Sequence, residues 1–273
     1  MDTTDPFRAF EYAGWSDGGV CAGYDEHFGT ITIQSAPALL EAAHVVEGMR
    51  VLDVCCGAGY LAGLAAERGA EAVGIDFSQA QIELAAARYP NAQFRAGDAT
   101  SLEFDDQIFD CVVNGIGIPH FENPDAAIAE AFRVLRRGGR FAFSVYAKPD
   151  EAIGFGLIYA AVQAHGTMDI GLPSGPNFFL FSDPSESERR LAASGFEKIE
   201  FRTVKQTWRL SSADELFAAV MNGSVRAAAT LRGQEEGALK KIKAAVEANL
   251  PDYLVEQEYQ IPMPVVVASG ARP

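Results

Sequence analysis

The chain has 273 residues, of which 48% are hydrophobic, and a formal net charge of −15 at pH 7. This length and apolar content suffice to bury a substantial core, so one α/β domain with additions is expected. The acidic charge argues against nucleic acid and anionic membranes as partners, because both would repel the chain at long range. No apolar run approaches the roughly 20 residues that a bilayer span needs, and the N-terminus lacks the basic start of a signal peptide. A cytoplasmic location is therefore expected.

The cysteines and histidines do not have the spacing of a metal site. The four cysteines contain no CxxC pair, and the four histidines are scattered along the chain. We therefore expect buried free thiols and no bound metal.

Residues 1–47 are expected to form an N-terminal helical cap. Proline is favoured in the first turn of a helix, so one helix is expected to begin at Pro6 and another just after Pro37. The stretch between them, which contains Gly18 and Gly19, is expected to be an aromatic-rich link.

From Gly48 onward, strands and helices alternate. Apolar runs predict strands over 50–54, 72–75, 93–96, 109–114 and 140–146, and helices over 60–68, 79–88 and 124–135. Ser78 begins an S-x-x-Q capping box at the start of the second of these helices. Five strands separated mostly by helices predict a doubly wound, mostly parallel α/β sheet with both faces covered.

After residue 146 the alternation is interrupted twice. The pattern predicts a helix over 153–165, a Gly/Pro-rich aromatic loop, a helix that a capping box opens at Ser185, strands over 199–210 and 259–267, and helices between these strands. We expect residues 48–273 to form one domain with lid insertions at about 151–184 and 212–250.

The first strand turns through Gly57 and Gly59 into a helix, which is typical of a nucleotide-binding loop. Glycine lets the backbone approach a ligand closely, and the helix N-terminus supplies free N–H groups. Taken alone, this loop also fits the dinucleotide fingerprint, because Ala62 completes G-x-G-x-x-A and Asp76 follows about 20 residues later.

Three aspartates lie at or just after the ends of three successive strands, and their positions help to decide whether the loop binds a dinucleotide or another nucleoside cofactor. Asp53 precedes the glycines, where a carboxylate would repel a pyrophosphate but attract the ammonium group of an amino acid. Asp76 suits ribose hydroxyls in either case, and Asp98 is placed to accept from an adenine amino group. The order amino acid, ribose and adenine favours S-adenosyl-L-methionine.

At these motifs the chain resembles the class I S-adenosylmethionine-dependent methyltransferases, especially the small-molecule branch similar to ubiquinone and menaquinone biosynthesis enzymes. The resemblance rests on DVCCGAG (53–59), GIDFS (74–78), GDA (97–99), FDCVVNGIGIPHF (109–121) and LRRGGRFAFSVY (135–146). It implies a seven-stranded, Rossmann-like sheet whose last strand runs antiparallel, with the inserted segments as a lid.

The resemblance also implies a set of cofactor-binding residues. These are Asp53, Gly57, Gly59, Asp76, Phe77, Asp98, Ala99 and Asn114. Cys55 departs from the pattern, since many family members have the first glycine of the loop there. This departure bears on the shape of the loop more than on cofactor binding, because Gly57 and Gly59 remain.

His120 follows the fourth strand and is the candidate catalytic residue. An imidazole there is placed to take a proton from an attacking O, N or C atom, and the alternative is a histidine that bonds the loop backbone or caps the next helix. Phe178 and Phe179 are candidate acceptor-binding residues, and the alternative is that this aromatic segment packs on the core.

Three aromatic residues near the N-terminus, Trp15, Tyr24 and Phe28, are candidates to close over the cofactor, because aromatic faces suit a sulfonium cation. Packing among helices is the alternative explanation.

The expected reaction is in-line displacement of the sulfonium methyl group by an O, N or C nucleophile of a small-molecule acceptor, giving S-adenosylhomocysteine. A nicotinamide-dependent oxidoreductase and a non-catalytic S-adenosylmethionine-binding module remain as alternatives. Asp53 and Asp98 count against the first, and the elaborated C-terminal half counts against the second. The sequence does not indicate the acceptor, the methylated atom or the oligomeric state.

Overall fold

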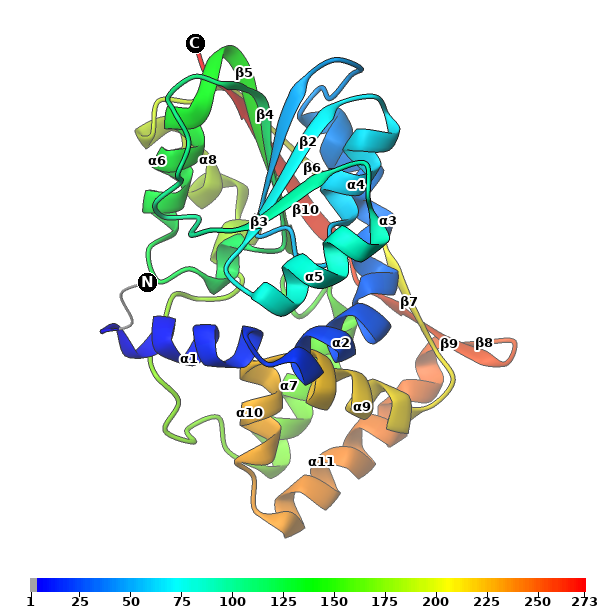
Figure 1. Cartoon of the computed structure of the whole chain (residues 1–273). Helices are drawn as coiled ribbons and strands as arrows, with labels where there is room; N and C mark the ends of the chain where they lie inside the picture. The colour runs from blue at the N-terminus through cyan, green and yellow to red at the C-terminus, as the bar shows by residue number, and fades with distance from the viewer. Residues whose placement is uncertain (1–3) are drawn as a thin grey trace.

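The computed structural model describes residues 4–273 and builds them around a seven-stranded sheet (Figure 1). Its strand order is β3-β2-β1-β4-β5-β10-β6. β10 runs antiparallel to both of its neighbours, whereas the other paired strands are parallel. The predicted doubly wound, mostly parallel α/β fold is therefore confirmed. The strands are β1 (Arg50–Val54), β2 (Glu71–Asp76), β3 (Gln93–Ala96), β4 (Phe109–Gly115), β5 (Leu135–Tyr146), β6 (Glu197–Val204), β7 (Thr207–Leu210), β8 (Leu254–Val255), β9 (Glu258–Pro262) and β10 (Val265–Ala271).

Helices occur before, between and after these strands. Within residues 4–273 the α-helices are α1 (Pro6–Trp15), α2 (Gly18–His27), α3 (Gly29–Ala42), α4 (Tyr60–Glu67), α5 (Gln79–Arg88), α6 (Pro124–Val134), α7 (Ile153–His165), α8 (Pro184–Ala193), α9 (Ala213–Gly223), α10 (Arg226–Arg232) and α11 (Glu236–Asn249). Short 3-10 helices are η1 (Ile118–His120), η2 (Leu180–Ser182) and η3 (Leu250–Tyr253).

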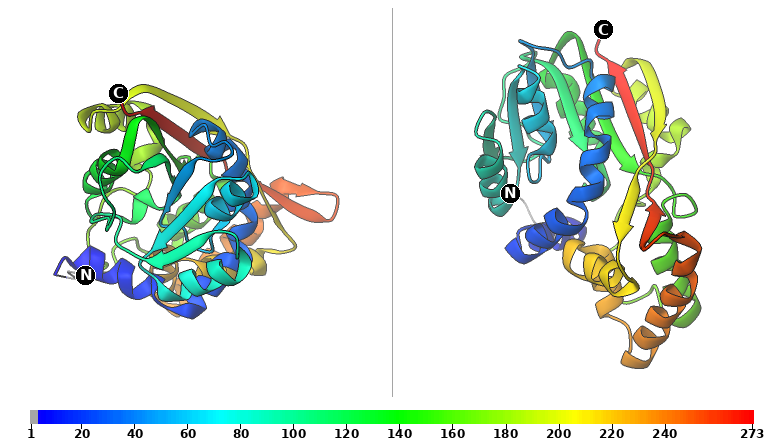
Figure 2. Two further views of the ribbon diagram at one scale, coloured as in Figure 1. Left: turned by 45° about the horizontal axis from the view of Figure 1, so that its top comes forward. Right: turned by 90° about the vertical axis from the view of Figure 1, so that its right-hand side faces the viewer.

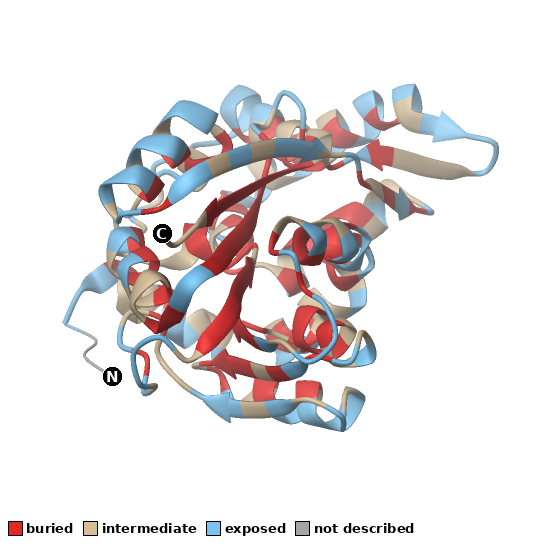
Figure 3. Ribbon diagram, turned by 90° about the horizontal axis from the view of Figure 1, so that it is seen from above, coloured by how far each residue is buried: buried red, intermediate tan, exposed pale blue. Residues whose placement is uncertain are grey.

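Each face of the sheet has its own hydrophobic core. Successive residues of a strand point to opposite faces, so Val51 of β1 packs in one core and Leu52 in the other. α3 and α4 cover the first core, with side chains such as Leu40, and α6 and α8 cover the second, with Ile128 and Leu191. Seen from above, buried strands run between two layers of helices (Figure 3).

The N-terminal helices agree with the sequence prediction at α1 and differ from it at α2. α1 begins at Pro6, and the carboxylate of Asp5 accepts from the N–H of Arg8 at 2.9 Å, as a capped helix start requires. The expected link is instead the helix α2, because Asp17 caps it by accepting from the N–H of Gly19 at 2.7 Å.

Pro37 lies inside α3, so the helix start predicted after it is wrong. α3 begins at Gly29, and its buried residues Leu39 and Leu40 hold it against the sheet. A proline inside a helix removes the hydrogen bond to the carbonyl four residues earlier. Here that residue is Ile33, which is 45% exposed, and the helix continues through Pro37 despite the lost bond.

Two strands predicted as continuous near the C-terminus are each divided between two sheets. The strand expected over 199–210 is β6 followed by β7, and the strand expected over 259–267 is β9 followed by β10. β7, β9 and β8 form a smaller sheet that projects from the main one (Figures 1 and 2). The break between β6 and β7 lies beside the break between β9 and β10, since the N–H of Met263 donates to the carbonyl of Gln206 at 3.0 Å. Pro264 follows Met263 and has no N–H, so the hydrogen-bond ladder between strands is interrupted there.

Most other boundaries agree with the sequence within a few residues. Ser78 caps α5 as predicted, but the box is not completed, because the N–H of Ser78 donates to Asp76 and Oε1 of Gln81 has no partner among residues 4–273. α8 is capped by Asp183 rather than Ser185, because the proline between them takes the first helical position. β5 begins at Leu135, directly after α6, rather than at Arg140.

Helices from both ends of the chain meet below the carboxyl ends of the parallel strands. α1 and α2 lie between this end of the sheet and the C-terminal helices α9 and α10 (Figure 1). α2 packs on α9, and α7 packs on α11. In the part of the chain that the structure describes, no helix is long and apolar enough to cross a membrane, and no three potential metal ligands cluster.

Candidate active site

The loops after β1, β2, β3 and β4 meet at one edge of the sheet, because the carboxyl ends of parallel strands share that edge. The strand order reverses between β1 and β4, so the loops after these two strands leave on opposite sides and open a crevice. Three cavities that share lining residues lie along this edge, and His120 lines all three.

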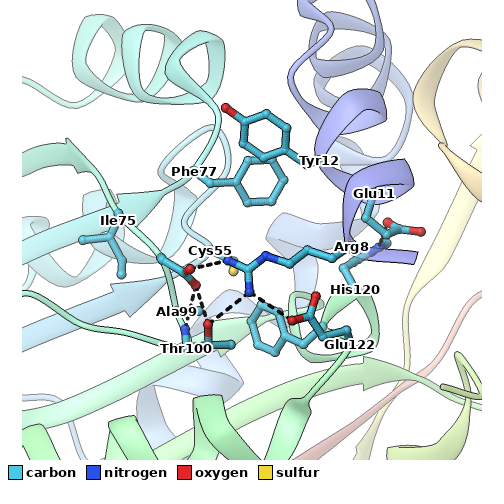
Figure 4. A pocket seen from close by; sticks show the side chains of 13 residues that line it. Arg8, Glu11, Tyr12, Cys55, Ile75, Phe77, Ala99, Thr100, His120 and Glu122 are labelled. Carbon is cyan, nitrogen blue, oxygen red and sulfur yellow. Dashed lines mark hydrogen bonds and ion pairs between the residues drawn. The ribbon is translucent and has the colours of Figure 1, made fainter. Parts of the chain in front are cut away.

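We name these cavities by their walls. The glycine-loop cavity is lined by Trp15, Tyr24, Thr32, Cys55, Cys56, Gly57, Ala58, Tyr60, Asp76, Phe77, Gln81, Gly115, Ile116, Gly117, His120 and Phe121. The Asp98 cavity, drawn in Figure 4, is lined by Arg8, Glu11, Tyr12, Cys55, Ile75, Phe77, Gly97, Asp98, Ala99, Thr100, His120, Phe121 and Glu122. The aromatic cavity is lined by Phe7, Glu11, Trp15, Tyr24, Phe28, Ile116, Pro119, His120, Tyr146, Phe155, Tyr159, Pro176, Phe178 and residues 223–227.

Two residues without the freedom of glycine adopt left-handed backbone at the glycine-loop cavity. Cys55 has a φ of 56° and Ile116 a φ of 62°. Left-handed backbone costs about 1–3 kcal/mol for such residues, and this strain tends to occur at functional sites. Cys55, the departure from the family pattern, therefore keeps the conformation that a glycine would adopt there. All four cysteines are free, and Cys55 is the half-buried one.

The two loop glycines have different roles. At Gly57, with a φ of 51°, an added Cβ would meet no atom within 4 Å, so its backbone is open to a ligand in the cavity. At Gly59, with a φ of 84°, a Cβ would lie 2.9 Å from the Ala85 side chain and the Phe94 ring. Gly59 thus allows close packing of the loop against the next unit, and it does not line the described cavities.

Asp76 and Phe77, at the end of β2, line the glycine-loop cavity. The carboxylate of Asp76 accepts from the N–H of Gly57 at 3.0 Å and from the N–H of Ser78 at 2.9 Å. Burial raises the pKa of Asp76 despite these hydrogen bonds. The Phe77 ring lies 5.2 Å from the ring of Tyr12 on α1. The predicted ribose-binding carboxylate is therefore held rigidly at the cavity wall.

Asp53 lies beneath the loop rather than on a cavity wall. One carboxylate oxygen accepts from the N–H of Ala62 at 3.0 Å, and the other, Oδ1, is buried with no hydrogen-bond partner in the described chain. Burial raises the pKa of Asp53 to about 8. The residue ties β1 to the first turn of α4, and its predicted contact with an ammonium group stays a prediction.

Asn114 joins the two loops that form the crevice. Its side-chain NH₂ donates to the carbonyl of Val54 at 2.8 Å, and its Oδ1 accepts from the N–H groups of Gly117 and Ile118, each at 3.0 Å. Asn114 thereby shapes the 115–117 turn, whose residues line the glycine-loop cavity, without lining it itself.

Arg8 of α1, which sequence reasoning missed, pairs with the carboxylate of Asp98, the residue predicted to accept from the adenine amino group. Arg8 forms ion pairs with Asp98 and with Glu122, the latter at 3.1 Å (Figure 4). Burial by itself would raise the pKa of Asp98, but hydrogen bonds from Thr100 and Arg8 outweigh it and lower this pKa. Ala99 lies buried in the same cavity. No motif marks Arg8, since it lies 90 residues from Asp98 in the sequence.

His120, in η1, contacts two residues of α1 that sequence reasoning did not connect with it. Its Nδ1 lies 2.8 Å from Oε2 of Glu11, and Nε1 of Trp15 lies 3.0 Å from the same oxygen and 3.3 Å from Nδ1. Because a carboxylate only accepts, the shorter contact with Glu11 favours a proton on Nδ1, and Nε2 is then the acceptor of the neutral imidazole. Within residues 4–273, Nε2 has no hydrogen-bond partner. This arrangement suits proton removal from a group in the shared region.

The two candidate acceptor-binding phenylalanines are both half-buried and have different neighbours. Phe178 lines the aromatic cavity, with its ring 5.5 Å from the His120 ring and 6.1 Å from the Phe155 ring. Phe179 does not line this cavity, and its ring lies 6.1 Å from Phe155 and 6.3 Å from Tyr159.

The other aromatic residues divide between cavity walls and core. Trp15 and Tyr24 line both the glycine-loop cavity and the aromatic cavity, and Phe28 lines the latter. Trp208 is buried in the core, 4.7 Å from Phe28, and Phe181 is buried beside Phe143.

The cavity walls fit a nucleoside that carries an amino-acid tail. The glycine-loop cavity offers the open backbone of Gly57 and the carboxylate of Asp76, which suit a ribose and a zwitterionic tail. The Asp98 cavity offers apolar walls at Ile75, Phe77 and Ala99, which suit a purine ring. The donor set therefore fits S-adenosylmethionine.

Comparison with known proteins agrees with this donor set. Residues 52–143 match a family model described as a methyltransferase domain. The chain is 36% identical over 111 residues to a demethylmenaquinone methyltransferase of Renibacterium salmoninarum, covering 41% of this chain and 47% of that protein. It is 35% identical over 118 residues to a chloroplastic 2-phytyl-1,4-beta-naphthoquinone methyltransferase of Arabidopsis thaliana, covering 39% and 45%. The match thus spans about half the length of these curated relatives.

Solved structures share the fold at low sequence identity. The YcgJ protein of Bacillus subtilis superimposes with a TM-score of 0.55 at 20% identity, over 87% of this chain and 97% of that one. A Haemonchus contortus phosphoethanolamine N-methyltransferase 2, in complex with phosphomonomethylethanolamine and S-adenosylhomocysteine, gives a TM-score of 0.59 at 17% identity, over 100% and 61%.

Residues 52–143 thus resemble a methyltransferase domain, and this region is similar to demethylmenaquinone methyltransferases and to a probable S-adenosylmethionine-dependent methyltransferase of Mycolicibacterium smegmatis. These similarities agree with the S-adenosylmethionine interpretation of the glycine loop.

Proposed function

We propose that this chain transfers the methyl group of S-adenosylmethionine to a small-molecule acceptor held in the aromatic cavity. One observation carries the proposal: His120 lines the glycine-loop cavity, the Asp98 cavity and the aromatic cavity at once. A group in the aromatic cavity would therefore meet the cofactor region beside an imidazole with a free Nε2.

The cofactor-binding residues fall into two groups under this proposal. Gly57, Asp76, Phe77, Asp98 and Ala99 line the cavities and would contact the cofactor. A second group would hold the binding loops in shape from behind; it consists of Asp53, Gly59 and Asn114.

The chemistry asks little of the protein beyond alignment and water exclusion. When bound, S-adenosylmethionine supplies an activated methyl group that an O, N or C nucleophile displaces, with S-adenosylhomocysteine as the product. His120 would accept the proton of the nucleophile at Nε2, while Glu11 holds Nδ1. The rings of Trp15 and Tyr24, which line both cavities, would exclude water from the space between cofactor and acceptor.

The helices below the sheet would act as a cover. We propose an N-terminal cap over 1–47, of which residues 1–3 lie outside the described range, and a domain over 48–273 with lid insertions at about 151–184 and 212–250. Phe7 of the cap and Phe178 and Arg226 of the insertions line the same aromatic cavity, which supports this division.

A ring-shaped acceptor of the quinone class is favoured. Relatives named for demethylmenaquinone and for a phytyl naphthoquinone match the methyltransferase domain. The aromatic cavity is lined mainly by rings, which suit a planar ligand. Nucleic acid remains disfavoured by the net charge of −15. The four free thiols support a cytoplasmic location.

The proposal is tested first by calorimetry with S-adenosylhomocysteine, S-adenosylmethionine and NAD. We expect micromolar-range affinity for the first two and negligible binding of NAD. Asp76→Ala is expected to weaken S-adenosylhomocysteine binding by about 1–3 kcal/mol, since a partly buried hydrogen-bonding carboxylate is lost. Methyl transfer to 1,4-dihydroxynaphthalene is then followed by mass spectrometry. NAD binding without a response to S-adenosylhomocysteine would contradict the proposal.

A further inference from the structure

The aromatic cavity contains a cationic group that the proposed reaction does not use. Its walls are mostly rings, including those of Tyr24, Tyr146 and Tyr159, and its acidic or basic side chains are Glu11, His120 and Arg226. Glu11 and His120 bond one another at 2.8 Å. Arg226, from the first turn of α10, is left without a carboxylate.

Arg226 has an incomplete set of partners. Its Nη2 donates to the carbonyl of Pro173 at 2.8 Å, and its guanidinium carbon lies 5.7 Å from the ring centre of Phe7. Its Nη1 is buried with no hydrogen-bond partner, and no carboxylate of the described residues pairs with it. Arg8 and Arg190, in contrast, are each paired with two carboxylates.

A buried guanidinium N–H without an acceptor is costly, because it has lost its water and gained nothing in return. A ligand oxygen would restore the missing bond. Guanidinium groups bind carboxylate and phenolate oxygens with charge-assisted hydrogen bonds, which are stronger than those between neutral groups. An anionic ligand oxygen beside Arg226 would therefore supply the acceptor that Nη1 lacks within the described residues.

Arg226 and His120 are walls of the same cavity. They contact different residues of α1, since Arg226 lies against the Phe7 ring and His120 bonds Glu11. A ring held in the cavity with an anionic oxygen at Arg226 would therefore have another part of its surface available to His120.

We propose that Arg226 binds an oxyanion, a carboxylate or a phenolate, on an aromatic acceptor whose nucleophilic atom faces His120. This inference rests on the proposed function, because it assumes that the aromatic cavity holds the acceptor. It narrows the acceptor from any small molecule to an aromatic ring with an anionic oxygen.

The test measures ligand binding by calorimetry to protein saturated with S-adenosylhomocysteine. Two matched pairs separate the two sources of the oxyanion: 2-naphthoate with 2-naphthamide for a carboxylate, and 4-nitrophenolate with 4-nitroaniline, well above neutral pH, for a phenolate. In at least one pair the anion is expected to bind roughly tenfold more tightly than its neutral partner. The pair that shows the preference identifies the source.

Arg226→Gln is expected to abolish this preference, since glutamine keeps donors but has no charge. Arg226→Lys keeps the positive charge and is expected to keep part of the preference for the anion. It therefore provides a second test if Arg226→Gln does not fold. Arg232→Gln, an exposed change at the other end of α10, is the matched control and is expected to keep the full preference. Thermal unfolding and S-adenosylhomocysteine affinity are measured for all three variants.

Equal binding of both members in both pairs would overturn the inference, and so would a preference that persists in Arg226→Gln. A different result would contradict the proposed function. That result is a parent protein that does not bind S-adenosylhomocysteine, whatever its affinity for the four aromatic ligands.

Discussion

Nδ1 of His120 lies 2.8 Å from Oε2 of Glu11, a contact between residues that are 109 positions apart in the sequence. Glu11 is 4% exposed, and Trp15 donates to the same carboxylate oxygen at 3.0 Å. The contact fastens α1 to the turn after β4 and fixes the orientation of the imidazole. The proposed base therefore depends on a carboxylate supplied by the N-terminal helix.

His120→Ala is expected to slow methyl transfer by about 10²–10⁴-fold, the usual contribution of a general base. S-adenosylhomocysteine affinity should change far less than the rate, because the proposed cofactor contacts at Gly57, Asp76 and Asp98 are retained although His120 lines both cofactor cavities. His120→Asn keeps a polar side chain but is unable to cycle a proton near neutral pH. Initial rates and calorimetry on both variants make the test. If asparagine restores the parent rate, His120 only positions the loop or the acceptor.

Glu11→Gln is expected to lower kcat with little change in KM for the acceptor. Glutamine still accepts from Nδ1 but no longer stabilises the positive charge that the imidazole gains on taking a proton. Both kinetic constants are measured for this variant and for Glu26→Gln, an exposed change on α2. A kcat equal to that of the control would show that Glu11 only packs α1.

Asp53→Asn is expected to flatten the pH dependence of stability. The pKa of Asp53 is raised from 3.8 to about 8 in the folded chain. The native state therefore binds more protons than the unfolded state between these values, so this residue lowers stability as pH rises from about 4 to about 8. The slope is at most about 1.4 kcal/mol per pH unit.

Urea unfolding at several pH values measures this slope as the difference between parent and variant. Asp105→Asn, a change at an exposed aspartate, is expected to retain the parent slope. Identical slopes in the parent and Asp53→Asn would mean that the Asp53 carboxyl is not protonated in the native state at neutral pH.

Local signals in the sequence were sufficient for most of the sheet and for the cofactor loops. Asp5 and Ser78 were predictable caps, because a capping side chain bonds backbone only two or three residues away. Gly57 and Asp76 were predictable because parallel strands bring successive loops to one edge.

The contacts of α1 could not be predicted in the same way. Arg8 and Glu11 lie 90 and 109 residues from Asp98 and His120, and no local period records where a helix will pack. Asp53 and Asn114 show the converse limit, since their motif positions were evident while the direction of each side chain depends on loop packing.

The neighbouring residues Phe178 and Phe179 are expected to respond differently to alanine. Both rings pack on Phe155, but only Phe178 also lines the aromatic cavity beside His120, whereas Phe179 contacts Tyr159. Phe178→Ala should raise KM for 1,4-dihydroxynaphthalene several-fold while S-adenosylhomocysteine affinity is kept, because it removes a wall of the acceptor space alone. Phe179→Ala should cost about 1–3 kcal/mol of stability and change KM little, since a half-buried ring is lost from packing. Steady-state kinetics and urea unfolding on the pair make the comparison. Should both variants lose stability equally with an unchanged KM, the aromatic segment belongs to the core, and the acceptor space is bounded by other residues.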